Sequence, residues 1–411
     1  MARRWLLVLV ATTGCRGLLG IEEPFVADAG GGTADAAPDA QCTRSSHRFD
    51  ACALGTPLPA LHLTSVEYTL DTTPIPAQLR NDKSAVPLLT TSLTFVQSDG
   101  QAAVILYVSA LSVDSEARLK IVGARPAIIV AEEDIVISGA LDAGSHLAEL
   151  SPTTHVAANV QIGAGANQAC TFSGGFAGGN GLPTAGSGGG GGGGGAGGGG
   201  TGGTGDGAMV LGGKAGTTQA TPTMVRGGCA GGSSGTAGTG ASSPATQATV
   251  SNGGAGGGAI HLAAFNQIRI LGSVLAGGAG GAGSPQGAAC GGGGGGSGGT
   301  IGLEAPVVML ENAQVAANGG GGGGGGLNAG FGANGRDGGG GTDLAPGGIA
   351  QSCGTAGGSG GAALLNGQSV LASDSCGGGG GGGGAGFVLI WTDMLAMTNG
   401  SISPAPRTDV P

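Results

Sequence analysis

The amino-acid sequence predicts an all-β fold: a parallel β-solenoid with long glycine-rich loops and a β-rich N-terminal region. Three observations predict it. Short segments of alternating apolar residues recur along the chain, a glycine or asparagine recurs at one turn within them, and long glycine runs separate the copies. Glycine supplies 99 of the 411 residues, and aromatic residues are only 3%. The core must therefore come from a minority of the chain, because ordinary proteins have only about 7% glycine.

The repeat occupies four segments that can be aligned with one another: residues 126–145, 258–278, 299–320 and 386–404. Each contains a short apolar strand, a brief break, a second strand, a turn and a third strand, with the alternation that a half-buried strand requires. The equivalent turn positions are Gly139, Gly272, Asn312 and Asn399, and the two asparagine copies carry one extra residue. Glycine and asparagine best tolerate a left-handed backbone, so the pattern predicts the same tight turn four times.

Stacked strands of this kind resemble the right-handed β-helices and the haemagglutinin-type surface proteins, over residues 100–150 and 255–404. A solenoid exposes one flank of every rung, and long inserts can leave there without disturbing the stack. We therefore assign residues 126–404 to a glycine-rich repeat region and 405–411 to a tail. The alternative fold is a β-sandwich of the same strands with glycine-rich insertions.

The start of the chain, "MARRWLLVLVATTGCRG", has two arginines followed by an apolar run over residues 5–11. The run is too short to span a bilayer, which indicates an export signal rather than an anchor helix. Together with the small residues before Cys15, it resembles a bacterial lipoprotein signal, although Thr12 stands where that family usually has leucine. The resemblance implies a signal peptide over residues 1–14 and a lipid on Cys15. The alternative is an ordinary secretory signal cut nearby.

Residues 15–41 are small, acidic and contain proline, which predicts a flexible tether after the lipidated cysteine. Residues 42–125 have an ordinary composition and contain further strand patterns, such as "AAVILYVSALSV". This β-rich N-terminal region could cap the first rung of the stack, which would otherwise expose unpaired backbone. Elsewhere no apolar run is long enough to predict a transmembrane helix.

The cysteine count agrees with export. If Cys15 carries lipid, seven cysteines remain, an odd number, so at least one is free or pairs between chains. The candidates for disulfides are Cys42, Cys52, Cys170, Cys229, Cys290, Cys353 and Cys376. Cys42 and Cys52 suit a small disulfide loop, and bridges in the glycine-rich segments would restrict chain that is otherwise highly mobile when unfolded. Zinc is not predicted, because the chain has no C-x-x-C and its histidines are not spaced as ligands.

The glycine runs at 187–200, 291–299, 319–326 and 377–386 allow two interpretations. Ordering glycine costs more backbone entropy than ordering any other residue, which favours solvated, flexible loops. The alternative is that the runs lie side by side as extended polyproline-II-like strands bonded through their backbones, because glycine permits close approach. No strict G-X-Y period occurs, so collagen is excluded.

Signals for catalysis and cofactors are weak. G-x-G-x-x-G matches by chance in a glycine run, and "AMVLGGKAG" lacks the residues of a phosphate-binding loop. The repeats also carry seven carboxylates, Glu132, Glu133, Asp134, Asp142, Glu304, Glu311 and Asp393, and Glu304, His261 and Arg269 are expected to point outward. A lone carboxylate makes no site, so we expect no enzyme and no cofactor. The net charge of −10 and the scattered basic residues argue against nucleic acid as a partner.

These observations predict a non-enzymatic cell-envelope lipoprotein with a structural or adhesive role at the surface. The expected partner is the membrane through the lipid anchor, with surface polysaccharide as a further partner, and the expected location is the outer membrane or cell surface. The composition resembles glycine-rich, PGRS-like surface proteins of bacteria, a likeness that implies no specific activity. The alternatives are a secreted glycan-binding module and a polysaccharide-active β-helix enzyme.

Overall fold

The computed structural model describes residues 46–408 except 65, 85–86, 91, 148–158, 169, 182–185, 206–208, 238–249, 286–288, 327–330, 351–352, 364 and 372–375. These residues belong to one compact unit, Arg44–Pro411. The predicted signal peptide, Cys15, the tether and Cys42 lie outside the described residues. Within them, regular structure is almost entirely β, with one short 3-10 helix, η1 (Ala51–Leu54).

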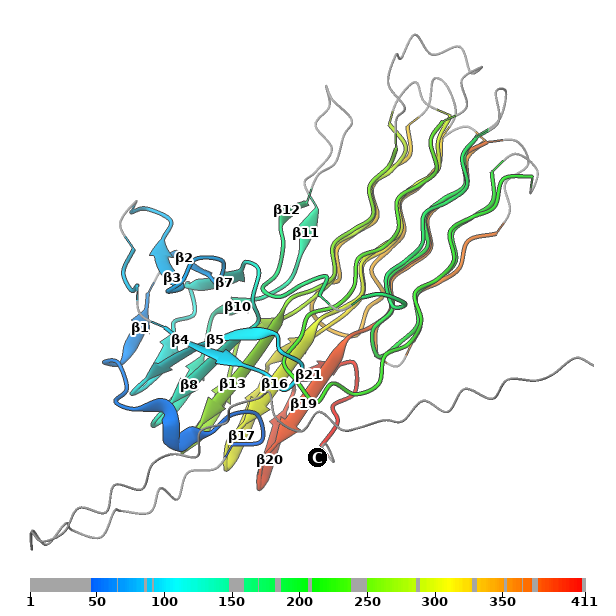
Figure 1. The fold of residues 1–411 in the computed structure, drawn as a ribbon. Coiled ribbons are helices and arrows are strands. Elements are labelled where there is room, and N and C mark those ends of the chain that lie inside the picture. The colour runs from blue at the N-terminus through cyan, green and yellow to red at the C-terminus, as the bar shows by residue number, and fades with distance from the viewer. Residues whose placement is uncertain are drawn as a thin grey trace, which may run out of the picture. The chain divides into compact units, whose positions relative to one another are not determined.

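Three large sheets hold most of the strands (Figure 1). Sheet A has the order β19 (Phe387–Trp391), β16 (Thr300–Glu304), β13 (Ala259–Ala264), β8 (Ala127–Ala131), β5 (Ala102–Val108), β4 (Leu93–Val96). Sheet B has the order β1 (Leu61–Leu63), β6 (Leu111–Val113), β9 (Asp134–Ile137), β14 (Gln267–Ile270), β17 (Val307–Glu311), β20 (Met394–Thr398). Sheet C has the order β21 (Ser401–Ser403), β18 (Gln314–Ala316), β15 (Ser273–Leu275), β10 (Ala140–Asp142), β7 (Arg118–Val122), β2 (Glu67–Asp71), β3 (Gln78–Asn81). A separate antiparallel pair joins β11 (His146–Leu147) and β12 (Asn159–Gln161).

Each copy of the repeat contributes one strand to each large sheet, in the order A, B, C. Ile260 pairs with Ile301 in sheet A, Ile268 with Val308 in sheet B, and Val274 with Val315 in sheet C, all in parallel register. Because the register is parallel, equivalent apolar residues of successive copies stack into one core that all three sheets enclose. The strands β5, β6 and β7 follow the same order, so residues 102–122 continue the same three sheets.

Two edges of these sheets are antiparallel. β4 pairs with β5 at one edge of sheet A, and β3 pairs with β2 at one edge of sheet C. Both lie at the N-terminal end of the stack, where the chain therefore supplies its own edge strands.

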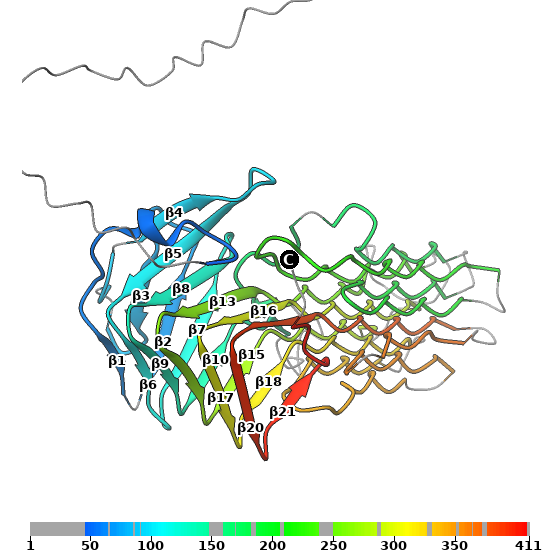
Figure 2. The same ribbon diagram turned by 90° about the horizontal axis from the view of Figure 1, so that it is seen from below.

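The glycine-rich segments all connect sheet C to sheet A. They follow β10, β15 and β18, and they occupy residues 143–258, 276–299 and 317–386. Their described parts run side by side as extended chains, and a second view shows them stacked in layers (Figures 1 and 2). We call these chains the glycine layer: 173–181, 186–205, 209–219, 227–237, 251–258, 276–285, 289–299, 317–326, 331–338, 345–350, 353–361, 366–371 and 376–386.

The chain 188–195 shows how the glycine layer is bonded. Its backbone N–H groups donate in three directions, and the direction repeats every third residue. Residues 188, 191 and 194 donate to carbonyls of the chain 173–179, residues 189, 192 and 195 to the chain 197–203, and residues 190 and 193 to the chain 292–295. A period of three is that of a polyproline-II-type helix, which has no hydrogen bonds of its own and must find them in its neighbours.

Close approach between these chains explains the glycine. A Cβ atom at Gly190, Gly293 or Gly322 would lie closer than 3.0 Å to a carbonyl oxygen of a neighbouring chain. The same holds for most glycines in the interior of the layer. A chain surrounded on all sides therefore needs glycine at nearly every position, whereas an outer chain can carry a side chain wherever it faces solvent.

The predicted fold class is therefore wrong. The sequence predicted a parallel β-solenoid with long glycine-rich loops, but the glycine runs are buried, backbone-bonded chains, and the strands lie in three mostly parallel sheets with antiparallel edges. The argument for flexible loops failed because it counted the backbone entropy lost on ordering glycine but not the hydrogen bonds and contacts that neighbouring runs supply. Each buried glycine gains backbone hydrogen bonds and close packing, which offset the ordering cost that the sequence pattern suggested.

Candidate functional site

Three of the four predicted turn positions, Gly139, Gly272 and Asn312, line one open groove. It holds about 330 Å³ and runs along the corner where the chain passes from sheet B to sheet C. The other lining residues are Ser115, Glu116, Ala117, Ser138, Ala140, Ser273 and Gln314. The fourth turn position, Asn399, is not part of the lining.

The turns themselves are of two kinds. Asn312 and Asn399 have φ of 51° and 52°, the left-handed backbone that the pattern predicted. At Gly139 and Gly272 φ is not positive, so the prediction of one identical turn is wrong at these two positions. Glycine is required at both positions because a Cβ atom would overlap backbone carbonyl oxygens in the equivalent turn of the preceding three strands.

The groove is polar but carries little charge. Parallel register places Ala140, Ser273 and Gln314 in one row across sheet C, beside the hydroxyls of Ser115 and Ser138. Hydroxyl and amide groups both donate and accept hydrogen bonds, and Glu116 is the one ionisable residue of the lining. This arrangement suits an uncharged ligand rich in hydroxyl groups.

A second candidate surface is the outer side of the glycine layer. Four chains lie next to one another there, bonded in the order 172–179, 209–217, 197–204 and 365–371. Exposed side chains recur at every third position: Leu211, Lys214 and Thr217 on one chain, and Leu365, Gln368 and Leu371 on another. We call this surface the glycine face. It is an array of uncharged backbone from which large apolar side chains project, among them Phe172, Phe176, Leu211 and Leu371.

The carboxylate that the sequence singled out, Glu304, has several partners. Its side-chain oxygens lie 2.9 Å from His261 Nε2 and accept hydrogen bonds from the backbone N–H of His47 at 2.8 Å and from Ser46 Oγ at 3.0 Å. Burial acts to raise the pKa of Glu304, but these hydrogen bonds outweigh it and the pKa is lowered. Arg48 also lies 4.5 Å from the centre of the Trp391 ring. The cluster fastens the start of the described chain onto sheet A.

The pairing of His261 with Glu304 was missed, although the repeat alignment contained the signal. Ile260 and Leu262 match Ile301 and Leu303, which puts both polar residues on the outward rows of adjacent strands. A Cβ at Gly302 would overlap the His261 ring, so this glycine makes room for it.

Another buried carboxylate, Asp142, belongs to a cluster that the sequence did not predict. His146 Nε2 lies 2.9 Å from Asp142 Oδ2, and His146 Nδ1 lies 3.1 Å from Asp337 Oδ2. These two carboxylates raise the pKa of His146 to about 9, so the ring is charged at neutral pH. Arg118 also pairs with Asp142. Because both ring nitrogens carry protons bonded to carboxylates, His146 acts as an ionic link between sheet C and the chain 331–338.

Three more of the predicted polar residues, Asp134, Arg269 and Glu311, form side-chain pairs. Arg269 forms two hydrogen bonds to Glu311, at 3.0 and 2.9 Å, and Asn266 donates to Asp134 at 2.6 Å.

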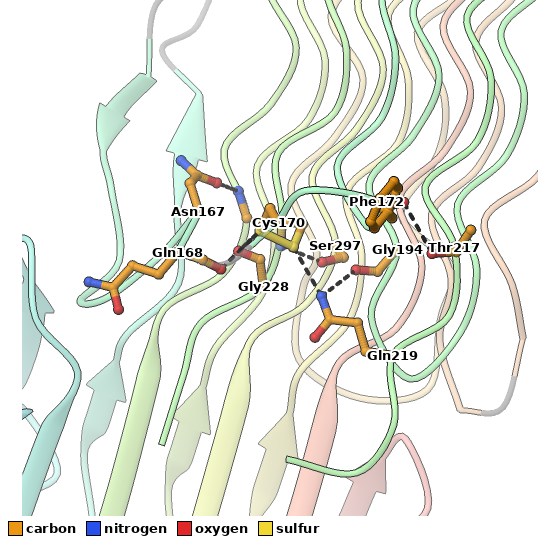
Figure 3. The surroundings of a disulfide bond; sticks show 11 residues. Asn167, Gln168, Cys170, Phe172, Gly194, Thr217, Gln219, Gly228 and Ser297 are labelled. Atoms are coloured by element: carbon orange, nitrogen blue, oxygen red, sulfur yellow. Dashed lines mark hydrogen bonds between the residues drawn. A yellow bond between two sulfur atoms is a disulfide. The ribbon is translucent and has the colours of Figure 1, made fainter. Parts of the chain in front are cut away.

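The cysteines form disulfides within and beside the glycine layer. Cys170 pairs with Cys229 and Cys353 with Cys376, while Cys290 is free and buried. Cys52 is disulfide-bonded, and its predicted partner Cys42 lies outside the described residues. Figure 3 shows the first bridge, where Gln219 Nε2 lies 3.0 Å from Cys229 Sγ and Cys229 N–H donates to Ser297 Oγ at 2.8 Å. This bridge joins the segment just before the chain 173–181 to the chain 227–237 of the glycine layer.

Comparison with protein-family models, with curated proteins and with solved structures gave no match. In the described part of the chain, no helix has the length and apolar character needed to cross a bilayer. Nor do the described residues hold a group of three or more histidines, cysteines or carboxylates that could bind a metal ion.

Proposed function

We propose that this chain is an exported, lipid-anchored envelope protein with an adhesive role, and that the glycine face is its contact surface. The observation that carries the proposal is the array on that face: exposed side chains stand at every third residue of two chains, 209–217 and 365–371, which are both bonded to the chain 197–204 between them. In a polyproline-II-type helix the rise is about 3.1 Å per residue, so equivalent side chains stand roughly 9 Å apart along each chain. Such a surface is regular and can meet an extended polymer at many points.

The packing of the layer supports this role. Its interior chains are almost entirely glycine and are held by backbone hydrogen bonds in three directions, so the face rests on a stiff base. Outward residues can therefore change without disturbing the interior. A rigid surface loses little conformational entropy on binding, which favours adhesion through many weak contacts.

The N-terminal sequence supports the anchor. The proposed lipid on Cys15 and the tether over residues 15–41 would join the membrane to the described chain, which begins at Ser46. There the contacts of Ser46 and His47 with Glu304 fasten the chain to sheet A. A tether can transmit a mechanical load to the folded domain only if its end is attached to the core, and these contacts provide that attachment.

Adhesion of bacteria that display the chain to a surface coated with neutral polysaccharide tests the proposal. The double variant Leu211→Ser/Leu371→Ser should reduce adhesion several-fold, because it removes two projecting side chains from the face. The matched control is Ile349→Ser, which is similarly exposed but lies on a chain bonded to other neighbours. Equal adhesion of all three would contradict the proposed contact surface.

The anchor is tested separately with Cys15→Ser. The wild-type chain should incorporate labelled fatty acid and stay with the cells, whereas the variant should be unlabelled and released. If both are unlabelled and both appear in the medium, the lipoprotein interpretation fails and a secreted protein remains.

A second candidate function is the binding of free glycans in the corner groove, favoured by its hydroxyl and amide lining. Ser273→Trp would fill the groove, and Gln314→Ala would remove an amide from it. Both should abolish binding of soluble neutral oligosaccharides in calorimetry while leaving adhesion through the glycine face unchanged. If oligosaccharide binding survives both substitutions, the groove is not the site.

A further inference from the structure

The C-terminal end of the stack leaves core positions uncovered. In β17, Val308 and Leu310 point into the core and are 0% and 1% exposed. Their register partners in β20 are Leu395 and Met397, which are 39% and 54% exposed. The repeat thus places two core residues at an end where, among the described residues, no further strand covers them.

Among the described residues, three of the other edges of the large sheets carry an antiparallel strand or a bridging segment, and the remaining two edge strands, β1 and β21, have only three residues each. β4 and β3 close the N-terminal edges of sheets A and C, and Arg407 forms a bridge with Leu389 along the outer edge of β19. In sheet B, the N-terminal edge strand β1 has only three residues. β20 has five, and β17 is its one neighbour within the sheet.

The sequence of β20, "MLAMT", carries none of the features by which proteins protect an edge strand. It has no charge and no proline, and Met394, Leu395 and Met397 are all exposed. Unpaired backbone beside exposed apolar side chains favours the addition of another strand.

We infer that two copies of this chain associate through the outer edges of β20, antiparallel, about a two-fold axis at Ala396. The pairing is self-complementary. Leu395 then lies opposite Met397 of the second copy on the core side, and Met394 lies opposite Thr398 on the outer side. None of the five residues Met394–Thr398 is charged, so no like charges face each other across the axis.

This geometry joins the two cores end to end and buries the uncovered residues. An isologous contact of this kind closes after two copies, because the edge of β20 is used up in both. The inference does not depend on the proposed adhesive function.

Sedimentation velocity over a range of concentrations tests the inference, with the full chain carrying Cys15→Ser to exclude a lipid. We expect a reversible dimer. Ala396→Asp should weaken it about tenfold or more, since it places two carboxylates directly opposite each other on the axis. Ala396 faces away from the core, so the folded monomer should tolerate the change. A chain that stays monomeric at every concentration overturns the inference.

Two further variants decide whether β20 is the edge involved. Ala396→Cys should form a disulfide between copies under mild oxidation, because directly opposed Cβ atoms are about 4.5–5.5 Å apart. Val96→Asp, an exposed change on the edge strand β4, should leave the dimer intact. Failure of the cysteine variant to cross-link, or dissociation by Val96→Asp as strong as by Ala396→Asp, would overturn the assignment to β20.

Discussion

Gly293 shows why a residue without a side chain can be essential for packing. It is buried, its N–H donates to the carbonyl of Ala282 at 2.8 Å, and a Cβ would lie closer than 3.0 Å to the Asn252 carbonyl oxygen. Gly339 lies in the same connection between sheets C and A as the chain 331–338, but nothing lies within 4 Å of its Cβ position. The two glycines have opposite requirements, which their sequence context does not reveal.

Gly293→Ala should therefore destabilise the fold by about 1–3 kcal/mol, the usual cost of overpacking a close-packed interior. Gly339→Ala should be neutral or slightly stabilising, since it only restricts the unfolded chain. Urea unfolding followed by circular dichroism compares the two. A loss of stability at Gly339→Ala equal to that at Gly293→Ala would mean that close packing is not the reason for the glycine.

Because of His146, the free energy of unfolding should decrease as the pH becomes alkaline. Its pKa is about 9 in the folded chain and about 6.5 when unfolded, so the folded state binds the extra proton. The stabilisation is complete below pH 6.5 and is lost as the pH rises through about 9. The shift corresponds to at most about 3 kcal/mol.

The melting temperature should accordingly fall between pH 7 and 10, and His146→Gln should flatten this fall. His62→Gln is the control, because the pairing of His62 with Asp114 is exposed and exposed pairs contribute little. The interpretation fails if the wild type and His146→Gln lose stability in parallel over this range.

At the scale of the elements, the apolar alternation was sufficient to predict which strands stack. The alignment of Ile260 with Ile301 and of Val274 with Val315 from the sequence is the register that the sheets adopt. The glycine runs could not be predicted in this way, because identical residues carry no register and every offset looks alike. Side-chain packing therefore sets the register of the sheets, whereas hydrogen bonds to backbone carbonyls set the register of the glycine layer.

The disulfides fix part of the alignment between glycine-rich chains. The number of residues that each bridge spans predicts how much it stabilises the fold. The bridge between Cys170 and Cys229 spans 59 residues, and that between Cys353 and Cys376 spans 23. In the chain-entropy account the longer loop contributes about 0.8 kcal/mol more, within a usual range of about 2–4 kcal/mol. Replacing both cysteines by alanine should thus cost more at the first bridge than at the second, measured by urea unfolding. The reverse order would show that native contacts, rather than loop length, govern the stabilisation.

At the scale of the whole molecule, two kinds of order share one chain. The three sheets bury apolar side chains such as Leu262, Leu303 and Ile390 in one core. The few apolar segments of the chain are enough to form it. The glycine layer buries few apolar side chains larger than alanine, so much of its stability must come from hydrogen bonds and dispersion between closely spaced backbones. The corner groove, the glycine face and the edge of β20 each arise where one of these two packings stops, which is why composition alone could not locate them.

This difference predicts an unusual pattern of amide hydrogen exchange. The interior runs 187–195, 291–299 and 377–386 should be protected nearly as well as the central strands β13 and β16, because their N–H groups are bonded and buried. Outward residues such as Leu211 and Lys214 should exchange far faster. Exchange measured by mass spectrometry on peptides from these runs separates the cases. If the interior runs exchange at the rate of an unfolded chain, they are loops, and both the glycine face and the adhesive role proposed for it lose their physical basis.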